Sequence, residues 1–332
     1  MEKIDFVITW VDGSDPKWQE KKNAYKKPAK DDPWATKENS DSVRFRDWDL
    51  LPFLFRGIEV NAPWVNHVYL VTDGQVPDFL NTNCEKLTVV DHKEFIPEKY
   101  LPVFSSQPIE LNLFRIPGLQ EEYVFFNDDM FLVNPCLPED YFKNGVPCDE
   151  GSLNGINGKD EIFAGMQFQN MSLMNRHYSN RNVKRHIGKW LYPGYGKNLI
   201  RTLLLLPFSR LQGIYNHHGP MPILKTTCKK VWKRDGKLLD ETCHHRFRSP
   251  FDITGYVFRY EQLLSGRFIP AKSINRYLDV TMPIKTIEKA MEKDNSICLN
   301  DAAMSEDAFI KRKAELHRLF EKKFPNKSMF EK

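Results

Sequence analysis

Two adjacent carboxylates follow a strongly apolar stretch in the first half of the chain. Asp128 and Asp129 come directly after Tyr123 to Phe126 and directly before Met130 to Leu132, which predicts a buried strand, an acidic turn and a second short strand. Ionised carboxylates beside an apolar strand need a counter-charge. A hard divalent cation such as Mg²⁺ or Mn²⁺ suits paired carboxylate oxygens and leaves positions for phosphate oxygens. The residues alone equally allow a plain β-turn at this point, since Asn and Asp are ordinary turn formers.

A histidine pair lies much later in the chain, in the segment Asn216 to Pro222. The side chains of His217 and His218 are expected to point to opposite sides, because adjacent residues rarely face the same way. A single imidazole that acts as acid or base is therefore a more economical interpretation than a pair that chelates one metal. Loop histidines that cap or pack are the ordinary alternative. The prolines after the pair predict the start of a helix.

A third candidate is Arg248, in a charged segment of the chain. A helix is predicted from Asp252 through Leu264, and Arg248 lies just before it. An arginine in this place can hold a phosphate with its planar fork while the helix dipole adds a positive potential behind it. The segment therefore predicts an anion site.

The first strand of the chain ends in an acidic loop. The run Asp5 to Trp10 is apolar and rich in strand formers, and it stops at Asp12, Gly13, Ser14 and Asp15 before Pro16 begins a helix. A strand, a glycine-containing loop and a helix N-terminus form a common binding place for phosphorylated ligands in α/β proteins. A plain capped turn is at least as common. A second loop of this type, Asp73 to Pro77, follows the strand predicted at Val65 to Thr72.

The elements around these residues predict an α/β fold. Strand, loop, helix and strand alternate up to Asn134, which is the pattern of a mostly parallel sheet with sites at its carboxyl edge. An amphipathic helix is predicted from Arg44 through Ile58, and irregular structure from Pro135 to Gly165. The stretch Asn170 to Leu206 predicts a helical insertion with a basic face, most simply a solvated one. No amphipathic anchor stands out. The basic residues of that face are Arg176, Arg181, Lys184 and Arg185.

The composition is that of an ordinary globular protein. The chain has 332 residues, 28% of them charged, and a net charge of +4, which does not by itself indicate nucleic acid. No signal peptide precedes the first strand and no apolar run reaches the ~20 residues of a membrane span, so we expect a cytoplasmic protein. Six cysteines are scattered without a Cys-x-x-Cys pair, so reduced thiols are expected rather than a zinc site.

Several of these segments together resemble the conserved regions of the Stealth family. Five segments resemble the first two regions of the family. They are Ile4 to Asp15, Arg44 to Asp47, Arg56 to Glu59, Ala62 to Val65 and Val71 to Pro77. A third resembles Phe104 to Ser106, Ile109 to Glu110 and Pro117 to Phe131, and a fourth resembles His218 to Pro222, Arg246 to Arg248 and Asp252. The segments occur in the expected order over most of the chain, which makes the resemblance far more specific than any single motif.

The resemblance implies a sugar-1-phosphate transferase with a glycosyltransferase-A-like α/β fold. Such an enzyme moves a hexose 1-phosphate or N-acetylhexosamine 1-phosphate from a UDP-sugar to a hydroxyl of an oligosaccharide, polysaccharide or lipid-linked glycan, and releases UMP. It implies a role in bacterial capsule or surface polysaccharide synthesis, with a divalent cation as cofactor. Nucleic acid is not an expected partner. Peripheral contact with the inner face of the membrane is compatible with a lipid-linked acceptor.

The resemblance also implies roles for particular residues. Asp128 and Asp129 would hold the cation, Arg248 would contact phosphate and His218 would act as base. Asp15 matches an essential carboxylate that could orient the histidine, bind the ion or act as a nucleophile, and these roles stay open. The residues expected to bind the rest of the substrate are Asp12, Gly13, Ser14, Arg44, Arg56, Asp73, Gly74, Gln75 and Asp252.

We expect one catalytic domain over residues 1–332. Residues 1–150 would form the nucleotide-sugar-binding core, 151–215 the loop and helical insertion, and 216–332 the C-terminal catalytic and acceptor part. Two other functions compete with phosphate transfer. One is a conventional metal-dependent glycosyltransferase that releases UDP, and the other is a sugar-binding protein without catalysis. A binding protein has no use for a base, an arginine and carboxylates together, which disfavours it.

Overall fold

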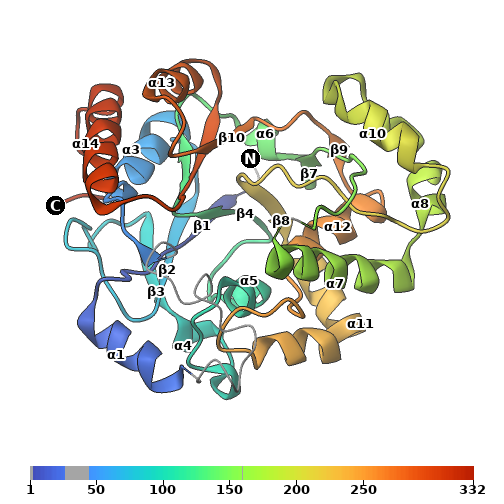
Figure 1. The fold of residues 1–332 in the computed structure, drawn as a ribbon, viewed down its shortest axis with the longest axis horizontal. Helices are drawn as coiled ribbons and strands as arrows, with labels where there is room; N and C mark the ends of the chain where they lie inside the picture. Colours follow the sequence, from blue (N-terminus) through green and yellow to red (C-terminus); the bar gives the residue numbers. More distant parts are fainter. Residues whose placement is uncertain (1–2, 27–44, 159) are drawn as a thin grey trace.

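The fold is built around a five-stranded central sheet. A computed structural model of the chain describes residues 3–26, 45–158 and 160–332. The strand order is β3-β2-β1-β4-β8, with β1, β2, β3 and β4 parallel to their neighbours and β8 antiparallel to β4 (Figure 1). The bounds of these strands are β1 Ile4–Thr9, β2 His67–Thr72, β3 Leu87–Asp91, β4 Glu122–Asn127 and β8 Met221–Leu224.

Each face of the central sheet packs against its own hydrophobic core. Side chains of a strand alternate between faces, so Phe6 and Ile8 enter one core while Val7 enters the other. The first core includes residues of α3, Leu51–Asn61, and α14, Glu306–Lys323. The second core includes residues of α5 Ser106–Asn112, α7 Glu161–His177, α11 Lys225–Cys243 and α12 Tyr256–Leu264. The sheet is therefore buried on both sides, as a mostly parallel sheet requires.

Smaller elements complete the fold beside the central sheet. One three-stranded sheet has the order β10-β11-β5 and another the order β6-β7-β9. Their bounds are β5 Met130–Leu132, β10 Asn275–Asp279, β11 Ser296–Asn300, β6 Phe142–Lys143, β7 Val146–Asp149 and β9 Ile269–Pro270. The remaining α-helices are α1 Pro16–Tyr25, α4 His92–Phe95, α6 Pro138–Tyr141, α8 Asn180–Arg185, α9 Ile187–Trp190, α10 Asn198–Leu205 and α13 Ile284–Lys293. Short 3-10 helices are η2 Glu98–Tyr100, η3 Leu113–Arg115 and η4 Pro193–Tyr195.

The predicted fold class is confirmed. The chain is α/β with a mostly parallel central sheet flanked by helices, and the helices α7 to α10 form an insertion between β7 and β8. The acidic stretch also has the predicted shape, since β4 ends at Asn127 and a second short strand, β5, begins at Met130. These two strands belong to different sheets, so Asp128 and Asp129 link the central sheet to a small one.

Three predicted boundaries were wrong. The helix expected from Arg44 begins at Leu51, with Pro52 in its first turn, because proline is favoured where a helix starts. A helix does follow the histidine segment, since α11 begins at Lys225, but the prolines do not begin it. Pro222 lies in strand β8, a fully buried run that pairs with β4, and short apolar runs cannot be assigned by periodicity alone. The helix expected from Asp252 begins at Tyr256. The segment expected to be irregular after Pro135 also contains α6, β6 and β7.

Candidate active site

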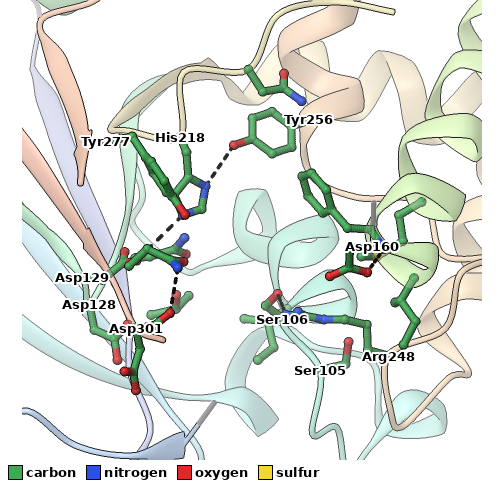
Figure 2. Close-up of a pocket in the computed structure, with 18 of the residues that line it drawn as sticks. Ser105, Ser106, Asp128, Asp129, Asp160, His218, Arg248, Tyr256, Tyr277 and Asp301 are labelled. Carbon is green, nitrogen blue, oxygen red and sulfur yellow. Dashed lines mark hydrogen bonds and ion pairs between the residues drawn. The ribbon is translucent and has the colours of Figure 1, made fainter. Parts of the chain in front are cut away.

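A large cavity opens at the carboxyl ends of the central strands. Its volume is about 1010 Å³, at the upper end of what small-ligand pockets reach. Thr9, Val71 and Asn127 line it from the ends of β1, β2 and β4, and residues of the insertion and of the loop before β8 complete its walls. Figure 2 shows Asp128, Asp129 and Asp301 on one side of this cavity and Arg248 with Ser105, Ser106 and Asp160 on the other, with His218 above them.

The acidic wall of the cavity includes Asp128, Asp129, Asp47 and Asp301, of which Asp301 is paired with Arg46. Asp128 is open to the solvent of the cavity, yet protein surrounds it closely. Burial in the cavity, together with the neighbouring carboxylates of Asp129 and Asp47, raises the pKa of Asp128 to about 7. The Oδ1 atom of Asp129 is buried and has no hydrogen-bond partner. Crowded carboxylates with an unused buried oxygen are the arrangement that a cation would neutralise.

His218 lies at the end of the loop that leads into β8, in an unusual backbone conformation. Its φ angle is +42°, in the left-handed region that ordinary side chains seldom adopt. The side-chain amide of Asn275 donates hydrogen bonds to the carbonyl oxygens of His217, at 3.2 Å, and His218, at 2.8 Å. A Cβ atom at Gly219 would meet Asn275 Cγ at 2.4 Å, so only glycine allows this close approach. The loop is therefore held in place from β10.

The imidazole of His218 lies between an acid and a phenol. Its Nε2 atom is 3.8 Å from Asp129 Oδ2, and its Nδ1 atom is 3.4 Å from the hydroxyl of Tyr256. The Tyr277 ring packs edge-on against it with centroids 5.6 Å apart. Burial alone would lower the pKa of His218, but Asp129 and the more distant Glu110 raise it above its ordinary value. The ring is thus a stronger base than a free imidazole.

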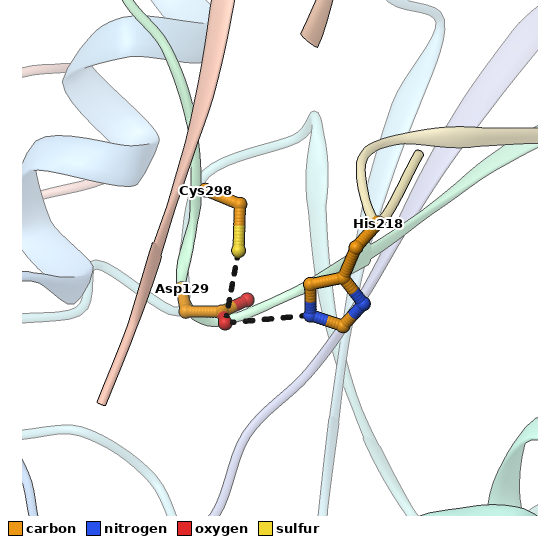
Figure 3. Close-up of side chains that lie close together, drawn as sticks. All are labelled: Asp129, His218 and Cys298. Atoms are coloured by element: carbon orange, nitrogen blue, oxygen red, sulfur yellow. Dashed lines mark hydrogen bonds and ion pairs between the residues drawn. The ribbon is translucent and has the colours of Figure 1, made fainter. Parts of the chain in front are cut away.

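Cys298 completes a compact group with Asp129 and His218. One ligand atom from each of the three lies within 4.8 Å of the others, so the group could hold a metal ion (Figure 3). The thiol donates a hydrogen bond to Asp129 Oδ2 at 3.2 Å, and burial beside the carboxylates raises the pKa of Cys298 far above its ordinary value. A protonated thiol is a poor ligand for a hard cation. In this state Cys298 orients the Asp129 carboxylate.

The opposite wall carries the predicted arginine. Arg248 Nη2 lies 3.5 Å from Ser106 Oγ, at the start of α5, and Arg248 is close enough to Glu110 and His218 to influence both electrostatically. Glu110 accepts a hydrogen bond from the backbone N–H of Gly255 at 3.1 Å. Burial raises the pKa of Glu110, while Arg248 and Ser106 oppose that shift. The guanidinium beside a hydroxyl suits an anionic ligand, although the Asp160 carboxylate stands on the same wall (Figure 2).

The loop after β1 forms a hydrogen-bonded unit next to the cavity. Asp12 Oδ1 accepts from the backbone N–H and the hydroxyl of Ser14, and Gln75 binds the backbone N–H and C=O of Asp12. Asp15 caps α1, and its carboxylate accepts from Lys17 N and from Gln75 Nε2, both at 2.9 Å. These hydrogen bonds lower the pKa of Asp15. Neither Asp12, Gly13, Ser14 nor Asp15 lines the cavity itself.

Asp73 does line the cavity, at the end of β2. It accepts from Lys21 Nζ at 2.6 Å, and the neighbouring Gly74 has a φ of +77°, which glycine alone adopts easily. His92 Nδ1 lies 3.8 Å from Asp73 Oδ1 and has no hydrogen-bond partner. Burial lowers the pKa of His92 to about 4, so it stays neutral there.

Two predicted substrate residues lie away from the cavity and have partners elsewhere. Arg56 forms a two-armed ion pair with Glu331, at 2.8 and 2.7 Å, which joins α3 to the C-terminal segment. Asp252 is fully buried and accepts from His245 Nδ1 at 2.6 Å and from Ser249 N at 2.8 Å. Neither residue lines the cavity. Arg44 lies outside the described residues.

Several site residues were missed by the sequence analysis. Asp47 and Glu110 stand in segments quoted for the family resemblance, so their position was a usable signal. Tyr256, Asn275 and Cys298 gave none, because each reaches the site through tertiary contacts with residues far away in the chain. The expectation that His217 and His218 diverge is confirmed, since His217 Nε2 lies 3.5 Å from Asp149 and His218 faces Asp129.

Fold and site together define an α/β protein with one large cavity that carries carboxylates, a histidine and an arginine. Models of two conserved regions of Stealth proteins match the chain, conserved region 1 at residues 2–27 and conserved region 2 at residues 44–148. The stretch expected in a third region, Phe104 to Phe131, therefore lies within the second, which corrects that assignment. The chain belongs to the Stealth family.

Relatives that match over most of the chain carry phosphotransferase names. The chain is 37% identical to the capsular polysaccharide phosphotransferase WcwK of Streptococcus pneumoniae, with 100% of both chains covered. It is 41% identical to the receptor polysaccharide phosphotransferase WefC of Streptococcus oralis, over 81% of this chain and 80% of the relative. It is 37% identical to the exopolysaccharide phosphotransferase cps2G of Lactiplantibacillus plantarum, over 99% and 96%. The protein is a phosphotransferase of this family.

Among solved structures, the chain aligns with the galactosyltransferase LgtC in complex with donor and acceptor sugar analogs. The sequence identity is 11% and the TM-score 0.42, with 96% of this chain and 95% of that chain covered. The α/β architecture of the present chain is established by its own sheet order.

Proposed function

We propose that this enzyme transfers a hexose 1-phosphate or N-acetylhexosamine 1-phosphate from a UDP-sugar to a hydroxyl of an acceptor glycan. The product would be a phosphodiester within a capsule or other surface polysaccharide. The observation that carries the proposal is the placement of His218 between a wall of carboxylates and a wall with Arg248 in one cavity. The names of the relatives, all polysaccharide phosphotransferases, support the same reaction class.

The proposed step is attack of the acceptor oxygen on the phosphorus that bears the sugar. The bond between this phosphorus and the bridging oxygen breaks, and the bridging oxygen leaves with UMP. The acceptor proton passes to the imidazole of His218, which Asp129 and Tyr256 hold in position. Arg248 lies across the cavity, where its guanidinium can stabilise negative charge on the transferred phosphoryl group.

The acidic wall fits a divalent cation such as Mg²⁺ or Mn²⁺. Asp128 and Asp129 would hold it, because their oxygens are hard ligands and their mutual repulsion is already visible in the raised pKa of Asp128. When bound, such an ion would neutralise the diphosphate of the donor. His218 then remains available for the proton, while a softer metal at Asp129, His218 and Cys298 would occupy the imidazole.

The proposed donor site uses the loops after β1 and β2. Asp12, Gly13, Ser14, Asp73, Gly74 and Gln75 would receive uridine and diphosphate, with Arg44 as a further anion partner. This is supported by the hydrogen bonds that join the two loops through Gln75 and by the position of Asp73 on the cavity wall. Asp15 would act indirectly, by fixing Gln75 and the start of α1. Arg56 and Asp252 would stabilise the fold around the site.

The proposed organisation is a single catalytic domain. Residues 1–150 would bind the donor, 151–215 would form the insertion and 216–332 would supply His218, Arg248 and the acceptor side. We place the reaction in the bacterial cytoplasm, at the inner face of the membrane where the acceptor is lipid-linked. A free oligosaccharide or polysaccharide is the other acceptor that the cavity size allows.

The test is to identify the products made from a panel of UDP-sugars and a candidate glycan. The proposal expects UMP as the released nucleotide and a phosphodiester resonance of the glycan in phosphorus NMR. Release of UDP with a phosphorus-free glycan would identify a conventional glycosyltransferase instead. Donor binding without turnover in the presence of Mg²⁺ or Mn²⁺ and every acceptor tried would favour the sugar-binding protein. His218→Ala serves as the matched inactive control.

A further inference from the structure

Helix α10 buries polar residues and exposes apolar ones, the reverse of an ordinary surface helix. Its buried residues are polar, Asn198 and Thr202, whereas Ile200, Leu203 and Leu204 are 62%, 54% and 68% exposed. The inward face is fixed by hydrogen bonds, from Asn198 Nδ2 to Glu150 Oε1 at 2.6 Å and from Leu153 N to Thr202 Oγ1 at 3.0 Å. A surface helix normally buries its apolar stripe. Here the apolar stripe faces outward, and the sequence pattern alone could not reveal which face is buried.

The apolar stripe continues beyond the helix and stands at the edge of the molecule. Phe208, which follows α10, is 51% exposed. Figure 1 shows α10 at the periphery of the fold, beside α8 and away from the central sheet. None of Ile200, Leu203, Leu204 and Phe208 lines the cavity. We name these four residues the α10 apolar surface.

The segment of the chain that contains the α10 apolar surface has basic residues but no acidic ones. Between Ile162 and Arg234 the sequence has no Asp or Glu, although the whole chain has 44 acidic and 48 basic residues. Seven lysines and arginines among the described residues of the insertion are exposed, and none of them forms an ion pair with a described residue. They are Arg176, Arg181, Lys184, Arg185, Lys197, Arg201 and Arg210. Exposed apolar side chains in a segment that is rich in exposed cations and has no acidic residue complement an anionic phospholipid surface.

We propose that the α10 apolar surface and its surrounding basic residues dock the protein on an anionic phospholipid bilayer. Aliphatic and aromatic side chains would enter the boundary between headgroups and acyl chains, while the lysines and arginines pair with lipid phosphates. A second copy of this chain is disfavoured as the occupant, because two such basic surfaces repel each other. Among the described residues no helix is long and apolar enough to cross a bilayer, so the contact is peripheral.

The docking surface belongs to the same segment that closes the cavity. Gly155, Ile162 and Met166 of the insertion, and Tyr215 after it, line the cavity wall. Docking would therefore place the bilayer against the same segment of the chain that forms one wall of the cavity. This consequence rests on the proposed function, since it matters only for an acceptor glycan carried by a membrane lipid. The docking itself needs no substrate.

The experiment is flotation of the purified full-length protein with vesicles, without donor or acceptor. We expect binding to vesicles of phosphatidylglycerol mixed with phosphatidylcholine, and little binding to phosphatidylcholine alone. The variant Leu203→Ser/Leu204→Ser/Phe208→Ser should have a partition coefficient more than tenfold lower, because three inserted side chains are lost. The matched control is Val60→Ser/Ile310→Ser, which removes exposed apolar residues, 62% and 58% accessible, from helices α3 and α14 and should bind as the wild type does.

A second variant tests the charge. Arg181→Gln/Lys184→Gln/Arg185→Gln should bind several-fold more weakly at low salt, and the difference should shrink as salt is added. Failure of the wild-type protein to bind phosphatidylglycerol vesicles would overturn the proposal. So would equal binding by the Leu203→Ser/Leu204→Ser/Phe208→Ser variant and the Val60→Ser/Ile310→Ser control. If sedimentation showed instead a wild-type dimer that the serine variant dissociates, the surface would be a contact between copies. UMP release with a water-soluble acceptor should be unchanged in the serine variant, which separates this proposal from the proposed function.

Discussion

His217 and His218 are neighbours in the chain, yet they belong to two regions with opposite electrostatics. His217 lies 3.5 Å from Asp149, which also forms a two-armed ion pair with the fully buried Arg259, at 2.7 and 2.9 Å. Although burial alone would raise the pKa of Asp149, Arg259 lowers it to about 2. His218 lies 3.8 Å from Asp129, where no arginine of the described residues forms an ion pair with Asp128 or Asp129 and the pKa of Asp128 reaches about 7.

The difference separates a structural charge network from a reactive one. Around His217 the charges of Asp149 and Arg259 are paired and hydrogen-bonded, so this ion pair fixes the fold. Around His218 the negative charge is left over, the backbone has a positive φ angle and one Asp129 oxygen has no partner. Unneutralised charge of this kind costs stability and is retained where a ligand is to be bound. The two histidines therefore predict opposite responses to substitution.

The largest expected effect on activity is that of His218→Ala. Loss of the base should lower kcat by about 10²- to 10⁴-fold while the free energy of unfolding changes little. His217→Ala is the matched control and should keep turnover within about tenfold, since His217 lines the cavity but its partners Asp149 and Arg259 do not. Steady-state kinetics and denaturant unfolding measure both quantities. Equal loss of kcat in the two variants would remove the distinction between the regions.

The largest expected effect on stability is that of Arg259→Leu. It leaves the buried carboxylate of Asp149 without its partner and should lower the free energy of unfolding by about 3–5 kcal/mol. The double variant Arg259→Leu/Asp149→Leu should recover part of that loss, because no unpaired charge remains. Denaturant melts of the three proteins make the comparison. A single variant as stable as the wild type would show that the network is not structural.

Asp128→Asn should stabilise the protein while it reduces activity. The pKa of Asp128 is raised from 3.8 to about 7, so the folded state binds this proton more tightly than the unfolded state does. Its contribution to stability is full below about pH 4 and is lost as the pH rises through about 7. With chelator at pH 8 the variant should therefore melt at a higher temperature than the wild type. A lower Tm at that pH would contradict this account of the acidic wall.

The same variant tests the cation. Mg²⁺ or Mn²⁺ should raise the Tm of the wild type, because a ligand that binds only the folded state stabilises it. The shift should be smaller for Asp128→Asn and Asp129→Asn. Asp47→Asn is an informative third variant, since Asp47 is near enough to raise the pKa of Asp128. Equal metal-induced shifts in all of these proteins would place the ion elsewhere.

The smallest expected effect is that of Asp15. Asp15→Ala removes the cap of α1 and should lower the free energy of unfolding slightly. Asp15→Asn keeps most of the cap and serves as its control. If Asp15 acts through Gln75, both variants should raise KM for the donor more than they lower kcat. A loss of kcat as large as that of His218→Ala, in a stable protein, would instead indicate that Asp15 takes part directly in catalysis.

The sequence was sufficient for the parts of the site that follow directly from strand order. Parallel strands bring their carboxyl ends to one edge, so Asp73, Asp128 and Asp129 were expected near each other. The family resemblance added His218 and Arg248, and all five of these residues line one cavity. The sequence could not show the partners of Arg56 and Asp252. Neither residue spacing nor helix pattern indicates an ion pair with Glu331 or a buried hydrogen bond with His245. Those contacts are set by tertiary packing.

The fate of the phosphorus nearest the sugar tests the central claim most directly. A UDP-sugar that carries a radioactive label only at this phosphorus would be incubated with the enzyme, the cation and an acceptor glycan, and the glycan would be separated from the nucleotides. The account predicts that the label enters the glycan and that the released nucleotide is unlabelled UMP. Label recovered in UDP, with none in the glycan, would contradict it.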